Sequence, residues 1–274
     1  MRCIDFDRRF AEYLSQWVKE HSRDYKTLED MEGDMLKVYL RFLNTPAPWL
    51  NGATPGAFFE QYSDAAELVQ WMREYCAKRV PVPDPLQERI LELGKDCEPG
   101  LMALLQDVSA PQEARMTAVG LLREMRSSAP KALYIAWQLN RRQKDELCDN
   151  ALESLAAMGR DVAPDMLDAI DGCNRAGQEA LLDVLTAYPG HEPVFALAMK
   201  FFEEDKKRRA LFAGYLGRLA DERALPALLK AAGEPNLPYL DFIEIRNAIE
   251  RLGGDAPERV FHDDPGYEAM IKMQ

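Results

Sequence analysis

Prolines recur at regular intervals through the C-terminal two-thirds of this 274-residue chain, and they constrain the fold more than any other feature. They stand at Pro99, Pro130, Pro164, Pro193, Pro226 and Pro257, so that successive prolines are 29 to 34 residues apart. A period of this length is typical of arrays built from near-identical supersecondary units. We therefore expect a repeat protein in which each unit packs mainly on its neighbours.

The residues just before each proline predict a junction between two helices. A glycine precedes four of the prolines, namely Gly94, Gly159, Gly190 and Gly253. Glycine readily takes the left-handed conformation that ends many helices, and proline is tolerated in a first helical turn because its missing N–H would have no partner there. Arg126 and Ala220 stand where the other two units would have glycine. Each proline is therefore expected to mark the start of a new helix.

A second pattern gives the same period independently. After each proline-led helix and a polar turn, apolar residues recur three apart: Val119, Leu122, Met125; Leu152, Leu155, Met158; Leu182, Leu185, Tyr188; Ala213, Leu216, Leu219; and Ile249, Leu252, preceded by the polar Arg246. This spacing places them on one face of a helix. Equivalent residues are 30 to 33 apart, so the unit is a helix pair, and we expect Leu155 and Leu185 to be fully buried.

Residues 216–229, with the sequence LGRLADERALPALL, show the helix–turn–Pro–helix pattern most clearly. On these residues the chain resembles the short bacterial type of HEAT repeat, also known as the phycobilin-lyase HEAT-like repeat, from about residue 86 to 261. The resemblance implies an all-α protein whose helix pairs form a right-handed α-solenoid, with the second helices lining a concave surface. The Thr-Pro-Leu-His signature of ankyrin repeats and the Trp/Gly/Tyr pattern of tetratricopeptide repeats are absent from the sequence.

Residues 1–80 do not follow the period and are rich in aromatic side chains. We expect four helices here, two covering residues 4–18 and 31–43 and two more starting at Thr54-Pro55 and at Ser63. The following stretch VPVPDP is predicted to be extended, because residues before proline avoid the helical region. We interpret residues 1–80 as an N-terminal helical cap on a solenoid formed by residues 86–261, with 262–274 as a tail; a separate docking module is the alternative.

The composition bounds the surroundings and partners of the chain. A formal net charge of −12 makes a nucleic-acid partner unfavourable, because phosphate binding depends on basic surfaces. No apolar run approaches the roughly 18 to 20 residues that span a bilayer, and the first residues contain no secretory apolar segment. The five cysteines form no CxxC motif, and we interpret them as small semi-buried residues. These features predict a cytoplasmic protein without a membrane partner.

Four acidic residues form the candidate binding site. Asp149 and Glu153 are four residues apart on one second helix, and Glu179 and Asp183 occupy the equivalent positions one repeat later. Like charges at this spacing cost a few tenths of a kcal/mol per pair, so they do not serve helix stability. We predict an acidic stripe on the concave face, either as a solubilising surface or as a groove for a basic peptide, an amine or a cation.

Two basic clusters fall at equivalent turns two repeats apart. They are Arg141-Arg142 with Lys144, and residues 206–209, with the sequence KKRR. Such runs are usually solvated turns, which is how we interpret them. The alternative is a local patch for an anion or RNA.

Catalytic patterns are weak throughout the chain. The three histidines, His21, His191 and His262, are scattered, and there is no Gly-rich phosphate loop or nucleophile elbow. We therefore expect no catalytic residue, no metal site and no cofactor. The predicted function is a non-catalytic scaffold or adaptor that binds a protein or peptide, a basic one if the stripe takes part. The alternative is a helical-repeat enzyme of the DNA glycosylase or phycobilin lyase type; the sequence does not define the oligomeric state.

Overall fold

The structure, a computed structural model, describes residues 2–261 and 264–273. Within these residues the chain is all-helical, with short turns between helices and no strand, which confirms the all-α prediction. The chain divides into two compact units, Met1–Pro130 and Lys131–Gln274, and each is described here by itself.

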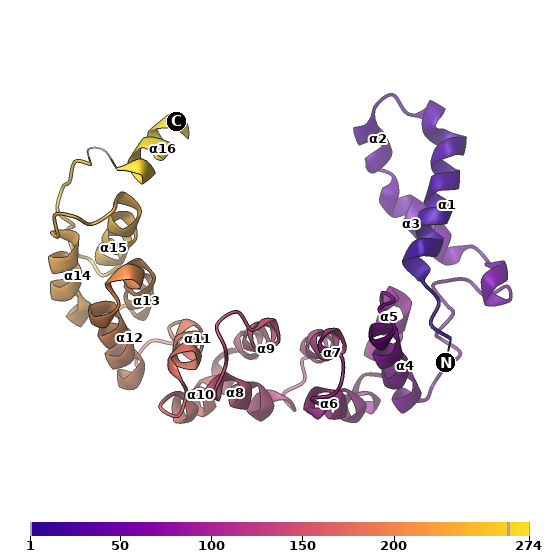
Figure 1. Cartoon of the computed structure of the whole chain (residues 1–274), viewed down its shortest axis with the longest axis horizontal. Helices are drawn as coiled ribbons and strands as arrows, with labels where there is room; N and C mark the ends of the chain where they lie inside the picture. Colours follow the sequence, from indigo (N-terminus) through magenta and orange to yellow (C-terminus); the bar gives the residue numbers. More distant parts are fainter. Residues whose placement is uncertain (1, 262–263, 274) are drawn as a thin grey trace. The chain divides into compact units, whose positions relative to one another are not determined.

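Unit 1 contains seven α-helices in its described residues (Figure 1). They are α1 (Phe6–His21), α2 (Leu28–Glu32), α3 (Met35–Asn44), α4 (Ala65–Ala77), α5 (Asp84–Leu93), α6 (Glu98–Gln106) and α7 (Gln112–Glu124). Helix α1 packs on α3, and α4 packs on α5, α6 and α7. Residues 80–83 form no helix before α5, and the backbone of Pro83 is extended, with φ −65° and ψ 139°, in line with the prediction from the prolines there.

The prediction of a helix starting at Thr54-Pro55 is wrong, whereas the helix predicted to start at Ser63 is present as α4, within two residues of the predicted start. Residues 55–61 form turns rather than a helix, and α4 begins after Asp64, whose carboxylate accepts hydrogen bonds from two N–H groups of the first turn. The turns bury Phe59 completely, with its ring centroid 5.8 Å from that of Phe6 and 5.1 Å from that of Trp71. Burial of this aromatic cluster therefore outweighs the local helix-start signal.

Unit 2 is built from four consecutive helix pairs followed by α16 (Pro265–Met273). The pairs are α8 (Lys131–Leu139) with α9 (Glu146–Ala157), α10 (Ala163–Ile170) with α11 (Arg175–Leu185), α12 (Glu192–Glu204) with α13 (Arg209–Leu219), and α14 (Leu225–Ala232) with α15 (Tyr239–Arg251). In Figure 1 the first helices of these pairs lie along one side of unit 2 and the second helices along the other. Helix α10 packs on α8, α11 packs on α8 and α9, and α13 packs along α15. The second helices therefore form one layer of this unit.

Five of the six periodic prolines stand where a helix begins. Pro99, Pro164, Pro193 and Pro226 lie in the first turns of α6, α10, α12 and α14, and Pro130 directly precedes α8.

Pro257 is the exception, because no helix begins there and the chain stays irregular to Phe261. The guanidinium of Arg259 donates to the carbonyl oxygens of Ala232, Glu234 and Pro235, in the turn between α14 and α15. The Phe261 ring packs on this unit as well, 5.2 Å between centroids from Phe242. These contacts hold the segment extended across the last helix pair, so the predicted helix start at Pro257 is wrong.

All six repeat junctions contain a residue with positive φ. The angle is 53° at Gly94, 76° at Gly159, 99° at Gly190 and 77° at Gly253, and it is 53° at both Arg126 and Ala220. The two units that lack glycine therefore keep the same backbone, although a side chain in the left-handed region costs roughly 1–2 kcal/mol. The repeat geometry overrides the residue preference at these two positions.

The predicted apolar column is the core between the two helices of each pair. Leu155 and Leu185 are 0% exposed, which confirms the prediction for both. Other members are buried, namely Val119, Leu122, Leu182, Ala213, Leu216, Leu219, Ile249 and Leu252. Met125, Leu152, Met158 and Tyr188 are half-buried at the column ends, and Arg246 is exposed.

The cysteines are small core residues, as predicted. All five are free thiols, and Cys76, Cys97, Cys148 and Cys173 are buried. Burial raises the pKa of the Cys76 and Cys97 thiols to about 11 and that of Cys148 to about 12. In the described part of the chain, no helix has both the length and the apolar character required to cross a membrane.

Candidate functional site

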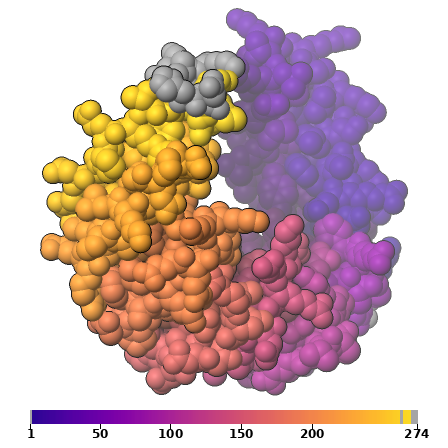
Figure 2. Space-filling model, turned by 60° about the vertical axis from the view of Figure 1, so that its left-hand side comes forward, coloured from indigo at the N-terminus to yellow at the C-terminus, as the bar shows by residue number. Residues whose placement is uncertain are grey.

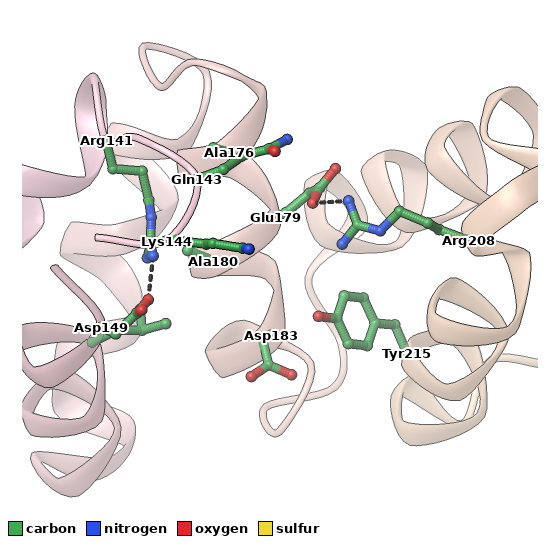
Figure 3. A pocket seen from close by; sticks show the side chains of 11 residues that line it. Arg141, Gln143, Lys144, Asp149, Ala176, Glu179, Ala180, Asp183, Arg208 and Tyr215 are labelled. Atoms are coloured by element: carbon green, nitrogen blue, oxygen red, sulfur yellow. Dashed lines mark hydrogen bonds and ion pairs between the residues drawn. The ribbon is translucent and has the colours of Figure 1, made fainter. Parts of the chain in front are cut away.

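A hollow of about 450 Å³ opens on the second-helix layer of unit 2. Its walls come from α9, α11 and α13 and from two inter-helix turns, the α8–α9 turn and the short 3-10 helix Lys206–Arg208 (Figure 3). Acidic side chains in the lining are Asp149, Glu179 and Asp183, and basic ones are Arg141, Lys144 and Arg208. The hollow therefore contains both signs of charge in equal number.

Three of the four residues of the predicted acidic stripe line this hollow. Asp149 and Asp183 are exposed, on α9 and α11. Glu179, also on α11, was expected to be exposed, but its side chain is only 14% accessible. Glu153 is exposed on α9 without lining the hollow. The repeat register thus brings Asp149, Glu179 and Asp183 to one place, and Glu153 lies outside it.

Each of these three carboxylates is paired with arginine. Asp149 accepts a hydrogen bond from Arg141 in its own helix pair. Asp183 accepts one from Arg218 Nη2 of the next pair at 2.6 Å. The stripe is therefore largely neutralised within the fold, whereas the sequence predicted an acidic surface.

Glu179 is paired twice, and these contacts explain its burial. Arg175 Nε lies 2.8 Å from one carboxylate oxygen, and Arg208 Nη1 lies 2.5 Å from the other. The Arg175 guanidinium also lies over the Phe201 ring of α12, 3.3 Å from its centroid. Arg175 and Arg208 therefore cover Glu179 and join α11 to the following helix pair.

Arg141 is held rigidly at the wall of the hollow. Its side chain is only 7% exposed, and Nη1 donates to Oε1 of Gln138 at 2.9 Å. Gln138 is itself fully buried, and its Nε2 donates to the Cys148 carbonyl at 3.1 Å. A buried polar network with its partners in place fixes side-chain geometry. The guanidinium is therefore pre-oriented toward the hollow before any ligand arrives.

The start of α11 is pressed against the end of α8, which positions the stripe residues on α11. Asn174 caps α11 by accepting from Gly177 N–H at 2.9 Å, and its amide Nδ2 donates to the Arg141 carbonyl at 2.9 Å. A Cβ on Gly177 would lie 2.0 Å from the Gln138 carbonyl oxygen. Only glycine therefore fits at this contact without a backbone shift.

Tyr215 on α13 completes the hollow opposite α9 (Figure 3). The residue is buried, and burial is the main cause that raises the pKa of its hydroxyl, with a further contribution from the charge of Asp183. Arg218 lies over its ring, 4.8 Å from the centroid. Asp183 and Tyr215 also line a second hollow of about 410 Å³, which reaches Glu244 and Arg251 on α15. The two hollows together thus extend over four consecutive second helices.

Both predicted basic clusters border the first hollow. Arg141 and Lys144 enter it from the α8–α9 turn, and Arg208 enters it from the Lys206–Arg208 helix. In the space-filling view, the rose part of unit 2 that contains α9 and the orange part that contains α12 and α13 lie around a hollowed surface (Figure 2). In the sequence, the two clusters occupy equivalent positions of their repeats, and this equivalence indicated that both would border the same surface.

The sequence interpretation missed Tyr215 and Arg218. Tyr215 follows Asp183 by 32 residues, whereas the register of the apolar column aligns Asp183 with Gly214, so the period did not identify Tyr215. Arg218 is 35 residues from Asp183 and matches no period in the pattern. Its role depends on how α11 and α13 face each other.

No group of three or more His, Cys, Asp or Glu side chains within the described residues could hold a metal ion. His21 stacks on Trp17 with Nδ1 2.9 Å from the Trp17 carbonyl oxygen, and His191 precedes α12. His262 lies outside the described residues. What the hollow offers chemically is therefore recognition of charged groups by fixed ion pairs and hydrogen-bond donors.

Comparison with known proteins identifies no relative: no protein-family model, curated protein or solved structure matches this chain.

Proposed function

We propose that this protein is a non-catalytic scaffold or adaptor of HEAT-like repeats, in which the helix pairs of residues 86–261 stack as a right-handed α-solenoid and residues 1–80 form its N-terminal cap. The support comes from local geometry that recurs with the period of the sequence. Every junction contains a residue with positive φ, and every pair encloses an apolar column. Within unit 2, the first and second helices form two layers (Figure 1).

The proposed binding surface is the second-helix layer, and its partner is a protein or peptide. The observation that carries this proposal is the pair of adjoining hollows that share Asp183 and Tyr215. The Asp183–Arg218 ion pair is half exposed, with side-chain accessibilities of 51% and 40%, and ion pairs at exposed sites contribute only about 0–1 kcal/mol, so a partner can exchange with this pair at low cost. Such a surface suits reversible binding of a chain segment.

The walls of the hollow favour a binding role over the enzyme alternative. A glycosylase must stack an extruded base between aromatic or apolar side chains. Among the described residues that line the first hollow, Tyr215 is the only aromatic one, and the carboxylates of Asp149, Glu179 and Asp183 are held by arginines.

Blocking the hollow sterically tests the proposal. Ala180 lies on α11 in the hollow wall, half-buried, so Ala180→Trp would fill the space with a large ring. Ala196 is exposed on the first helix α12, and Ala196→Trp is the matched control. Peptides selected from a random library on the wild-type protein should bind Ala180→Trp at least about tenfold more weakly and should bind the control unchanged.

Two results would contradict this function. Selected peptides that bind both variants equally would place recognition elsewhere on the molecule. Release of free base from alkylated duplex DNA, abolished by Ala180→Trp, would support the glycosylase alternative instead. Circular dichroism melting of both variants shows beforehand that each is folded.

A further inference from the structure

The internal pairing reverses the sign of charge that the hollow offers to a partner. Arg141, Arg208 and Arg218 already hold the carboxylates that the sequence marked as an acidic site. Basic side chains in the two turns that contribute to the hollow remain uncompensated: Lys144, which lines it, and Arg142, Lys206 and Lys207, which stand in the same turns without lining it, are exposed and make no ion pair or side-chain hydrogen bond to any residue that the structure describes. We call these four residues the basic rim.

Nearby acids do not neutralise the basic rim. Asp145 caps α9 by accepting from Cys148 N–H at 3.1 Å, and Asp205 lies 3.9 Å from Arg175. Glu146 and Glu203 are exposed at the adjoining helix ends but do not line the hollow. Within the hollow itself, the charge left without a partner among the described residues is therefore the positive one of Lys144, although the whole chain is at −12.

We propose that the hollow and its basic rim bind an acidic segment of a partner protein, with a carboxylate of that segment entering between Lys144 and Arg208. This inference rests on the proposed function and names the chemistry of its partner. Lys144 is the one basic side chain in the lining that no carboxylate holds among the described residues.

An acidic peptide fits the surroundings better than a nucleic acid does. A nucleic acid needs a continuous basic track, because each phosphate carries charge along the whole strand. Here the adjoining second hollow is lined by Asp183 and Glu244 as well as by Arg218 and Arg251, so the surface is not continuously basic. A short acidic segment can end before the second hollow, whereas a polynucleotide would continue across it.

Charge removal at the rim tests the inference directly. The variant Arg142→Gln/Lys144→Gln/Lys207→Gln removes three unpaired charges from the two turns that contribute to the hollow and touches none of the ion pairs. The control Arg160→Gln/Lys200→Gln/Lys230→Gln removes three exposed basic side chains elsewhere in unit 2. Both triples change the net charge equally, from −12 to −15 (−12 − 3), so only position differs.

Three fluorescein-labelled probes are compared by fluorescence anisotropy: a peptide of alternating Glu and Ser, its Lys/Ser counterpart, and a single-stranded RNA of equal charge. We expect the Glu/Ser peptide to bind most tightly. Its affinity should fall roughly tenfold in the rim variant and less than about twofold in the control. It should also weaken as salt rises from about 0.05 M to about 0.5 M, because exposed charges are screened.

The remaining outcomes would overturn the inference, and they are distinguishable from failure of the proposed function. No binding of the Glu/Ser peptide, or equal loss in both triples, removes the acidic-segment site. Tighter binding of the Lys/Ser peptide restores the original expectation of a basic partner. Equal or tighter binding of RNA with the same rim dependence assigns the site to nucleic acid. In each case library-selected peptides that remain sensitive to Ala180→Trp would leave the scaffold function intact, and loss of that sensitivity would remove it.

Discussion

Replacing Gly177 by alanine should destabilise the protein, although intrinsic helix propensity predicts the opposite. Gly177 lies in the first turn of α11, where alanine would ordinarily gain about 1 kcal/mol over glycine. Its Cβ, however, would stand 2.0 Å from the Gln138 carbonyl oxygen and 3.1 Å from Cys173 Cβ, whereas real Cβ contacts are essentially never shorter than 3.0 Å. The first of these neighbours is backbone, so α11 must move away from α8 by about 1 Å.

The cost of that movement can be worked from the contacts it disturbs. Overpacking of this kind costs roughly 1–3 kcal/mol. The shift also lengthens the hydrogen bond from Asn174 N–H to the Leu139 carbonyl, now 2.7 Å, which contributes about 1 kcal/mol. After subtracting the propensity gain, we expect a net loss of roughly 1–3 kcal/mol in the free energy of unfolding.

Gly214 supplies the matched control, because it lies within α13, the next second helix, and a Cβ there would meet nothing within 4 Å. Gly214→Ala should gain about 0.5–1 kcal/mol from helix propensity. Urea unfolding followed by far-UV circular dichroism measures both midpoints. If Gly177→Ala unfolds at the same or a higher urea concentration than the wild type, the argument from the α8–α11 contact is refuted.

Three further substitutions or modifications test other parts of the fold. Ala220→Gly should stabilise the protein by about 1 kcal/mol, because Ala220 is exposed and its φ of 53° favours glycine. The control Ala196→Gly, inside α12, should cost a similar amount. A loss of stability in Ala220→Gly would contradict the left-handed junction. Leu155→Ala should lower the free energy of unfolding by roughly 2–5 kcal/mol in chemical unfolding, since Leu155 is 0% exposed. A loss below about 0.5 kcal/mol would mean that the register is wrong. Leu229→Ala is the milder control, because Leu229 is 37% exposed. In thiol titration with a disulfide reagent at neutral pH, half-buried Cys3 should react first. Cys148 should react only on unfolding, because burial raises the pKa of its thiol to about 12. Rapid reaction of Cys148 in the folded protein would show that its helix opens readily.

The helix pairs and their core were predictable from the sequence, because their signals are local. Each of these signals acts within one helix or one turn: a proline in a first turn, a residue with positive φ before it, and an apolar residue at every third position. The repetition of these signals made the period visible even where Arg126 and Ala220 replaced glycine. The same register placed Asp149 on α9 and Asp183 on α11, which the structure brings to one hollow.

Local signals were insufficient where contacts distant in sequence compete with them. Pro257 begins no helix because Arg259 binds carbonyl groups of the preceding turn, and Thr54-Pro55 begins none because the chain there turns to bury Phe59. Neither of these competing contacts produces a periodic pattern in the sequence. Each depends on the packing of elements that the pattern treats separately.

The charge of the candidate site was decided only by tertiary structure. Four acids at one helical phase indicate a negative surface when the sequence is considered alone. Arg208 reaches Glu179 across 29 residues and Arg218 reaches Asp183 across 35, because α11 and the next helix pair face each other. Coulomb energy depends on the distance between charges in space, so the pairing that neutralises the stripe and leaves the basic rim exposed could not be read from spacing along the chain.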